Sequence, residues 1–352
     1  STPSNSSAAS DVYKRQKDLS IDWGKLQTRR EKVLRRLRLG VRYLLEGNGV
    51  KIVEGEAKLA SGMIVQVKLK DGSEKKFRAE KIIVATGGEH ASIPSIPIDG
   101  RRVITSSQAL ELPEIPKSLL IVGGGVSGLE IGTAYAKIGT KVTIVEIMDQ
   151  ILPGVEKDLV EVVQKKLRRL GVKIYTKSKV VKSQVTGDLV KAWVESEEKG
   201  SFEIEADYAM VAVGKKAATE NLGLEELGVK LGKNGFIEVN DKLETSASGI
   251  YAIGDVTGPP FLAHRASYPG IVAAENIAGK EVKVDETAMP SAIFTDPELA
   301  WAGFTASEAE NRGIKVRIGK FAFSALGRAV LEGETDGFVK IIADGSTGHV
   351  IG

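Results

Sequence analysis

The sequence predicts an α/β protein in which buried strands alternate with helices. Short continuous apolar runs, typical of strands buried on both faces of a parallel sheet, occur at 82–85, 119–122 and 209–213. Each run leads into glycine within two residues, and a helical pattern and another apolar strand follow the run at 119–122. The 352 residues are 42% hydrophobic and 27% charged, the balance of a globular protein large enough for two or three domains.

The first part of the chain predicts one long helix followed by short strands. Residues 1–16 are small, polar and aperiodic, and we expect them to be disordered and foreign to the folded protein. Residues 23–45 have the apolar spacing of an amphipathic helix rich in Arg and Lys. Its basic side could bind phosphate, but the net charge of only +3 favours a solvated outer face. Alternating residues predict strands at 50–53, 64–69 and 75–78.

The most informative segment is 119–146, where a strand, a G-x-G-x-x-G turn, a helix and a second strand follow one another. Gly123 permits the tight turn, Gly125 lets the backbone approach a pyrophosphate, and Gly128 lets the helix pack closely on the strand. The N–H groups at the helix start favour the phosphate charge. A glycine-rich packing turn is the alternative, but the complete order of elements indicates a dinucleotide site.

The second strand of this segment ends at an acid, Glu146, about twenty residues beyond the glycines. A carboxylate at this place accepts hydrogen bonds from an adenosine ribose. The four residues that follow contain no Arg or Lys to bind a 2′-phosphate, and the carboxylate would repel one. The sequence therefore predicts NAD in preference to NADP.

The remaining pattern continues the α/β alternation and then changes. We expect helices at 156–170, 267–278 and 306–312, and strands at 173–175, 189–195, 202–205, 250–253, 316–323, 338–343 and from 349 onward. The block 290–352 is predicted to be a separate α+β domain that stops within a strand.

These motifs together resemble those of the pyridine nucleotide–disulfide oxidoreductases, and within that family the dihydrolipoyl dehydrogenases. The likeness runs from 18 to 352 and, besides the glycine segment, includes IIVATGG (82–88), GIYAIGDV (249–256), LAHRASYPGIVAAENIAG (262–279) and IFTDPELAWAGFTASEAE (293–310). It implies two nested Rossmann-like domains, for FAD and NAD(P), and a C-terminal α+β dimerisation domain. The implied boundaries are 17–116 and 231–288 for the FAD domain, 117–230 for the NAD domain and 289–352 for a truncated dimerisation domain.

The resemblance also assigns site residues. For NAD these are Gly123, Gly125, Val126, Ser127, Gly128, Glu130, Glu146 and Gly214; for FAD they are Ala85, Thr86, Gly87, Gly254, Asp255, Leu262, Ala263 and His264. Asp255 is expected to bind the ribityl chain, although such an acid can also cap a helix or turn. Glu130 is expected near the nicotinamide, with a solvated helix acid as its alternative. Many relatives carry an aromatic residue and Ile where Val126 and Ser127 stand, so the resemblance does not extend to gating by an aromatic ring.

Two family features are absent from the 352 residues: a second, earlier G-x-G-x-x-G unit and the C-x-x-x-x-C redox pair, since the chain has no cysteine. None of the histidines, His90, His264 and His349, stands in the setting of the family's C-terminal base. We therefore expect a fragment without catalytic residues or a metal site, which binds FAD weakly and does not oxidise dihydrolipoamide.

For the complete protein, the resemblance implies electron transfer from a dithiol through a disulfide and FAD to NAD. The expected partners are the dihydrolipoyl groups of 2-oxoacid dehydrogenase or glycine cleavage complexes and a second subunit, with no nucleic acid and no membrane, in the cytoplasm. Mercuric reductase and soluble transhydrogenase share the fold and remain alternatives, as does an NAD-binding scaffold without catalysis.

Overall fold

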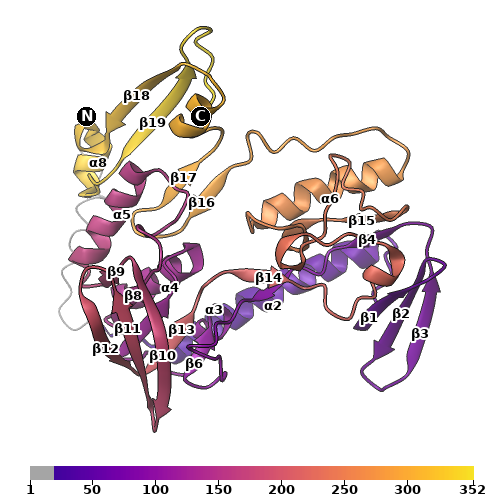
Figure 1. Cartoon of the computed structure of the whole chain (residues 1–352), viewed down its shortest axis with the longest axis horizontal. Helices are drawn as coiled ribbons and strands as arrows, with labels where there is room; N and C mark the ends of the chain where they lie inside the picture. The colour runs from indigo at the N-terminus through magenta and orange to yellow at the C-terminus, as the bar shows by residue number, and fades with distance from the viewer. Residues whose placement is uncertain (1–19) are drawn as a thin grey trace. The chain divides into compact units, whose positions relative to one another are not determined.

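The computed structural model describes residues 20–352, so the prediction for residues 1–16 lies outside it (Figure 1). The chain divides into two compact units. The first unit contains residues up to 52 and residues 111–115, and the second unit contains residues 53–110 and 116–352. Within the described residues, no helix is both long and apolar enough to cross a membrane.

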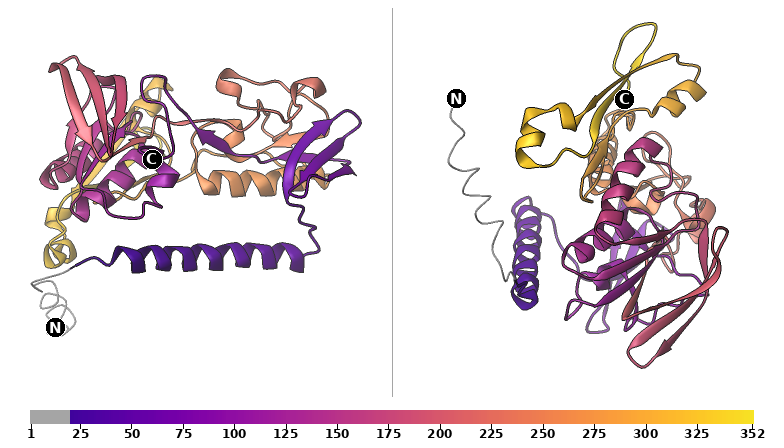
Figure 2. Two further views of the ribbon diagram at one scale, coloured as in Figure 1. Left: turned by 90° about the horizontal axis from the view of Figure 1, so that it is seen from below. Right: turned by 90° about the vertical axis from the view of Figure 1, so that its left-hand side faces the viewer.

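The described part of the first unit consists mainly of α2, Trp23–Gly47, which Figure 2 shows as one unbroken helix (indigo). The predicted helix is confirmed and is two residues longer at its C-terminal end. Asp22 caps it by accepting a hydrogen bond from the backbone nitrogen of Lys25 at 2.9 Å. The indole nitrogen of Trp23 donates to the carbonyl of Leu112 at 2.8 Å, which ties residues 111–115 to the helix.

The second unit contains a five-stranded parallel sheet in the order β6-β13-β7-β8-β9. Its strands are β6 Val103–Thr105, β7 Ser118–Val122, β8 Lys141–Val145, β9 Lys173–Tyr175 and β13 Tyr208–Val211. The predicted helices after β7 and β8 are confirmed as α4 Val126–Lys137 and α5 Lys157–Arg169. Gly132 on α4 allows close packing, because a Cβ there would lie 2.8 Å from Ile121 of β7.

A three-stranded antiparallel sheet covers part of the parallel sheet (Figure 1). Its strands are β10 Ser178–Thr186, β11 Leu189–Ser196 and β12 Gly200–Ala206. Its inward residues share one core with the parallel sheet: Val180, Val190, Ala192 and Val194 with Leu120, Val122, Val145 and Val211. The strands predicted at 189–195 and 202–205 are confirmed as the hairpin β11–β12. Strand β10 was not predicted, because a register shift between Val180 and Lys182 interrupts its apolar alternation.

The remaining part of the second unit before residue 290 has small sheets around another core. One antiparallel sheet consists of β1 Gly55–Ala60, β2 Ile64–Leu69 and β3 Glu74–Arg78. A parallel pair is formed by β4 Ile82–Val84 and β15 Ile250–Ala252. An antiparallel pair is formed by β5 Gly88–His90 and β14 Lys215–Ala217. The strand predicted at 50–53 is wrong. The pairing of this sheet begins where Gly55 faces Leu69, the last residue of β2, so residues 50–53 do not form one of its strands.

The helices of this part are α3 Ser106–Ala109, the short 3-10 turns Glu225–Leu227, Lys233–Gly235 and Gly254–Thr257, and α6 Ala263–Ile277. Helix α6 begins about four residues before the predicted position. Pro269 lies inside α6, although proline is ordinarily tolerated only in the first turn of a helix.

The C-terminal part of the second unit is α+β, as predicted. Its elements are β16 Ser291–Ile293, β17 Leu299–Trp301, α7 Ala306–Asn311, β18 Val316–Ala322, the 3-10 turn Phe323–Ala325, α8 Gly327–Glu332 and β19 Phe338–Asp344. Strands β16 and β17 form one antiparallel pair, and β18 and β19 form another. The strand predicted from residue 349 is present only as a single bridge between Ala343 and Val350.

Candidate functional site

The glycine turn lies at the point of the parallel sheet where the strand order reverses. From β7 the chain continues through β8 to β9 on one side, whereas β13 lies on the other side of β7. Ligands of open α/β sheets bind at the carboxyl ends of strands at such a point. Gly123 follows β7 directly and has a φ of +107°, and a Cβ on it would lie 2.4 Å from the carbonyl oxygen of Ala212, just after β13. Only glycine fits this position without distortion.

The other two glycines of the turn differ in their surroundings. A Cβ on Gly128 would lie 2.3 Å from the carbonyl oxygen of Gly123, so Gly128 is required for packing. A Cβ on Gly125 would meet no atom within 4 Å, so its side faces open space. Gly125 is also the N-cap of α4, and the next two residues, Val126 and Ser127, are exposed. The turn thus presents a bare, accessible helix N-terminus, which suits a phosphate group.

Glu146, at the end of β8, is buried and holds the glycine turn directly. One carboxylate oxygen accepts a hydrogen bond from the backbone nitrogen of Gly124 at 2.5 Å, and the other accepts from that of Met148 at 2.8 Å. An ionised carboxylate has about four acceptor positions, so Glu146 retains capacity for two hydroxyl groups of a ligand. The residue after it, Ile147, is exposed. This arrangement fits an adenosine ribose.

Two further residues predicted for the dinucleotide have different surroundings. Glu130, on the first turns of α4, is half-buried and accepts a hydrogen bond from the backbone nitrogen of Phe294 at 2.9 Å. It is therefore not simply a solvated helix acid. Gly214 follows β13, is exposed and has a φ of +111°. It lies at the same carboxyl edge of the sheet as the glycine turn.

The residues predicted for FAD gather at a second sheet edge. Strands β4 and β15 are parallel neighbours, so the segments that follow them, 85–87 and 254–255, lie at one edge. The backbone nitrogen of Ile253 donates to the carbonyl of Val84 at 3.1 Å and extends this pairing. Thr86 and Gly87 are held by Ala218: its carbonyl accepts from the Thr86 hydroxyl at 2.8 Å, and its nitrogen donates to the Gly87 carbonyl at 3.1 Å.

Asp255 forms an ion pair at this edge that the sequence did not predict. Lys215 Nζ lies 2.6 Å from its carboxylate and 5.5 Å from the centre of the Phe261 ring. Lys215 also pairs with His90 across β14 and β5. Burial lowers the pKa of His90, and the charge of Lys215 lowers it further. Only the position of Lys215 directly after Gly214 could have drawn attention to it, and no motif includes it.

The start of α6 completes this edge. Leu262 is the N-cap and Ala263 the first residue of the helix, and no side chain caps it. A Cβ on Gly254 would lie 2.9 Å from Cβ of Ala266, so Gly254 allows the turn after β15 to pack against α6. His264 is a neighbour of this helix start, and its Nε2 lies 2.6 Å from the carbonyl oxygen of Pro290. An acid, exposed backbone and a helix N-terminus at one edge fit part of a flavin site.

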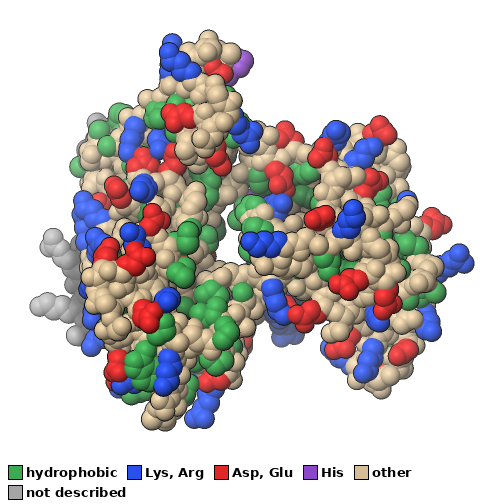
Figure 3. All heavy atoms as spheres, viewed as in Figure 1, with side chains coloured by type: hydrophobic (Ala, Val, Ile, Leu, Met, Phe, Trp, Pro, Cys, Tyr) green, Lys and Arg blue, Asp and Glu red, His purple; other side chains and the backbone are tan. Residues whose placement is uncertain are grey.

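A cavity of about 420 Å³ lies between the start of α5 and the C-terminal sheets. Aromatic side chains contribute much of its wall, namely Phe294, Trp301, Phe304, Phe323 and Phe338. None of the residues predicted for NAD or FAD lines it. Acidic and basic side chains are interspersed on the face of the chain drawn in Figure 3, in keeping with the small net charge.

Comparison with known families and proteins agrees with this geometry. A family model described as pyridine nucleotide-disulphide oxidoreductase matches residues 1–270, and the dimerisation domain of the same family matches residues 289–352. Dihydrolipoyl dehydrogenase from Geobacillus stearothermophilus is 40% identical over 335 residues, which cover 95% of this chain and 71% of that protein. The enzyme of the same name from Thermus scotoductus is 41% identical over 334 residues, covering 94% and 71%.

Solved structures give the same result. The crystal structure of LpdA from Mycobacterium tuberculosis superposes with a TM-score of 0.88 at 28% identity, covering 99% of this chain and 77% of that one. The HOCl-induced flavoprotein disulfide reductase RclA from Escherichia coli superposes with a TM-score of 0.83 at 27% identity, covering 94% and 75%. The chain belongs to the pyridine nucleotide-disulphide oxidoreductases, the flavin-dependent enzymes that bind FAD and NAD(P) and dimerise through their C-terminal domain.

Proposed function

We propose that the chain binds NAD, in preference to NADP, at the glycine turn, and that it forms part of the FAD site of a dihydrolipoyl dehydrogenase. In this proposal residues 117–230 form the NAD domain, residues 17–116 and 231–288 contribute to the FAD domain, and residues 289–352 belong to the dimerisation domain.

The bond between Glu146 and Gly124 is the observation that carries the NAD assignment. It joins the ribose-binding carboxylate to the turn that would hold the pyrophosphate, so one ligand can reach both. In the proposal the backbone of Gly125, Val126 and Ser127 binds the pyrophosphate, and Gly123 and Gly128 shape the turn. Gly214, which has no side chain, leaves the carboxyl edge of the sheet after β13 accessible to the ligand. Glu130 lies on the same helix and faces the nicotinamide end.

The flavin assignment is supported by the edge formed after β4 and β15. Asp255 would accept hydrogen bonds from the ribityl hydroxyls, while the backbone of Leu262 and Ala263 faces the ring system and His264 packs beside it. Residues 85–87 would form the opposite side of the edge. When bound, FAD and NAD supply the electron and hydride transfer of this family, and the residues of this chain bind and orient them.

The proposed substrate is the dithiol of a dihydrolipoyl group, because the relatives at 40% and 41% identity carry that activity in their names. We propose 2-oxoacid dehydrogenase or glycine cleavage complexes as its source and a homodimer as the working form. None of the 352 residues is cysteine, so these residues do not themselves perform the thiol–disulfide step.

A nucleotide titration tests the NAD assignment. We expect NADH to bind the folded chain at least about tenfold more tightly than NADPH, because the buried Glu146 carboxylate repels a 2′-phosphate. The measurement is the change in NADH or NADPH fluorescence on addition of the chain. Equal binding of the two, tighter binding of NADPH, or no binding of NADH by the folded chain would refute the assignment.

A further inference from the structure

The segment Ile147–Glu156, which we call the bridging loop, contacts the glycine turn through its middle residues, Ile151 and Leu152. The backbone nitrogen of Leu152 donates to the carbonyl oxygen of Gly124 at 2.8 Å. The side chain of Ile151 is completely buried, and its Cγ2 lies 3.0 Å from the place where a Cβ on Gly124 would stand. The loop therefore contacts the same glycine that Glu146 holds.

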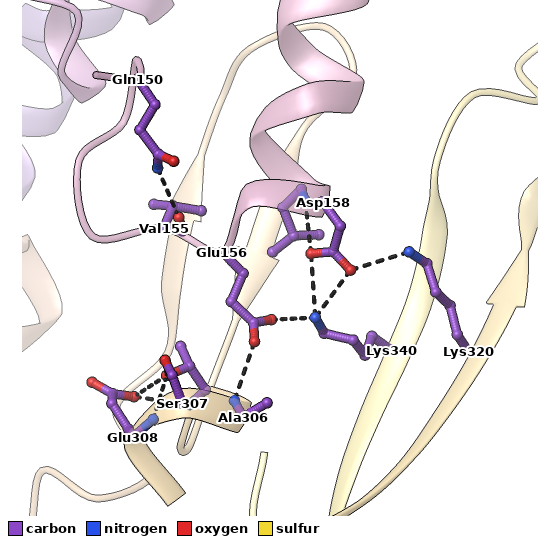
Figure 4. Close-up of polar contacts among 11 residues, drawn as sticks. Gln150, Val155, Glu156, Asp158, Ala306, Ser307, Glu308, Lys320 and Lys340 are labelled. Carbon is purple, nitrogen blue, oxygen red and sulfur yellow. Dashed lines mark hydrogen bonds and ion pairs between the residues drawn. The ribbon is translucent and has the colours of Figure 1, made fainter. Parts of the chain in front are cut away.

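The far end of the bridging loop is fixed by the C-terminal part of the chain, as Figure 4 shows. The carboxylate of Glu156 lies 2.6 Å from Nζ of Lys340 on β19 and accepts a hydrogen bond from the backbone nitrogen of Ala306 at 3.1 Å. Lys340 also lies 3.0 Å from the carboxylate of Asp158, at the start of α5. Both side chains of the Glu156–Lys340 pair are largely buried, at 18% and 14% exposure, so solvent screens their attraction little.

The bridging loop has a conformation that needs support from the surrounding structure. Leu152 has a φ of +50°, a left-handed conformation that is unfavourable for a residue with a Cβ. Such residues persist where their surroundings determine them. Within the loop, the Gln150 side chain donates to the carbonyls of Leu152 and Val155, at 3.3 and 3.0 Å. The loop is thus internally tied, its middle residues are held by Gly124, and its C-terminal end is held by Lys340.

We propose that Lys340 is a positioning residue for NAD binding, which acts through Glu156 and the bridging loop on the glycine turn. The proposal rests on the proposed NAD site. With Glu156 fixed, Leu152 and Ile151 hold Gly124 in place before the dinucleotide arrives, and the ligand does not have to order the turn. A residue of the segment that matches the dimerisation domain thereby contributes to nucleotide affinity without touching the nucleotide.

The chain offers a matched control for this proposal. Lys320 on β18 is the direct cross-strand partner of Lys340. Its Nζ lies 3.1 Å from the carboxylate of Asp158, so it forms its ion pair there rather than with Glu156. Lys340→Met removes the support of the bridging loop, whereas Lys320→Met removes a lysine of the same sheet and leaves the Glu156–Lys340 pair intact.

The test compares these variants in the full 352-residue chain, with folding checked by circular dichroism and thermal melting. We expect Lys340→Met to weaken NADH binding about tenfold, Lys320→Met to change it less than about twofold, and Lys340→Arg to recover most of the loss. Hydrogen exchange of residues 147–156 gives a second readout that needs no ligand. We expect faster exchange in Lys340→Met than in wild type or Lys320→Met.

The outcomes separate this proposal from the NAD assignment. If wild type binds NADH and folded Lys340→Met binds it equally well, the proposal is overturned and the NAD site stands. If wild type binds no NADH, the NAD assignment fails, and unchanged loop exchange in Lys340→Met would overturn the positioning role as well. If Lys340→Met does not fold, Glu156→Gln is tested in its place. Glu156→Gln removes the charge at the end of the loop but leaves an acceptor for the N–H of Ala306. Unchanged NADH affinity in Glu156→Gln would equally overturn the proposal.

Discussion

Glu146 and Gly124 are 22 residues apart in the sequence, and their 2.5 Å hydrogen bond joins the end of β8 to the turn after β7. The bond gives the carboxylate a structural task in addition to the proposed ligand contact. It also fixes the distance between the two proposed anchoring points of the dinucleotide, the ribose site and the helix N-terminus. A change at Glu146 should therefore affect the stability of the turn and nucleotide binding together.

Two glycine substitutions in the turn should separate packing from binding. Gly128→Ala places a methyl group 2.3 Å from a backbone oxygen, and we expect it to destabilise the fold by about 1–3 kcal/mol. Gly125→Ala meets no atom, and its φ of −78° and ψ of −174° suit alanine, so we expect wild-type stability within about 0.5 kcal/mol. Its methyl group would nevertheless stand before the helix N-terminus and weaken NADH binding about tenfold or more.

Urea unfolding and NADH titration of both variants check this prediction. Gly139→Ala is not a suitable control, because Gly139 has a φ of +102° that alanine rarely adopts. Gly40→Ala in α2 is suitable, since a Cβ there meets nothing within 4 Å and should change NADH affinity little. A Gly125→Ala variant that binds NADH like wild type would show that the pyrophosphate does not approach this residue.

Glu146→Gln should reduce nucleotide affinity and specificity. The amide group of glutamine replaces one acceptor oxygen by a donor, so the N–H of Gly124 or of Met148 loses its partner. We expect a loss of about 1–3 kcal/mol in stability and a loss of about tenfold or more in NADH affinity. Because the repulsive charge is gone, the preference for NADH over NADPH should narrow.

The control for this variant is Glu195→Gln, in an exposed pair with Lys179 on the antiparallel sheet, which should leave NADH affinity unchanged. Fluorescence titrations with NADH and NADPH provide the comparison. An unchanged ratio of the two affinities in Glu146→Gln would mean that this carboxylate does not select the nucleotide.

The local part of the site could be predicted from the sequence, because each of its elements has a local signal. The strand before Gly123, the glycine spacing and the apolar strand before Glu146 all lie within 28 residues, and the structure has β7, α4 and β8 there. Predictions failed where pairing decides the structure. Residues 50–53 alternate like a strand but are not paired in the sheet of β1, β2 and β3, and β10 alternates imperfectly because of its bulge.

The ion pairs around the site could not be predicted, since their members are far apart in the sequence and have no motif. Lys215 and Asp255 are 40 residues apart, and Lys340 and Asp158 are 182 residues apart. A lysine or an acid on a surface strand usually carries no structural information by itself. Only the folded chain brings the bridging loop, α5 and β19 together.

The contacts of Asp158 predict how stability depends on pH. Burial alone would raise the pKa of Asp158, but its hydrogen bonds with Lys340 and Lys320 and their charges outweigh this and hold its pKa below 3.8. Its contribution is thus fully present above pH 3.8, the value of the unfolded chain, and is lost as the pH falls through the lower folded value. Burial lowers the pKa of Lys340, but Glu156 and Asp158 raise it above 10.5, so its contribution is lost only as the pH rises through that folded value.

We therefore expect Asp158→Asn to be less stable than wild type by about 1 kcal/mol at neutral pH, and the difference to shrink as the pH falls below about 3.8. Urea midpoints of both proteins across this range measure it. Asp241→Asn, in an exposed pair with Lys283, serves as the control and should differ little from wild type at any pH. A stability difference for Asp158→Asn that stays constant down to about pH 2 would contradict the assigned ion pairs.

The last prediction concerns turnover of the proposed substrate. Oxidation of a dithiol in this family needs a thiol pair on the enzyme, and the 352 residues contain no cysteine. We expect the chain, supplied with FAD, to reduce NAD with dihydrolipoamide no faster than a blank, although it binds NADH. The measurement is NADH formation followed by absorbance, with the Geobacillus stearothermophilus dihydrolipoyl dehydrogenase as the positive control. Activity that depends on the chain and is lost in Asp255→Ala would show that the flavin edge works without thiols, and would favour a reaction other than disulfide exchange for these residues.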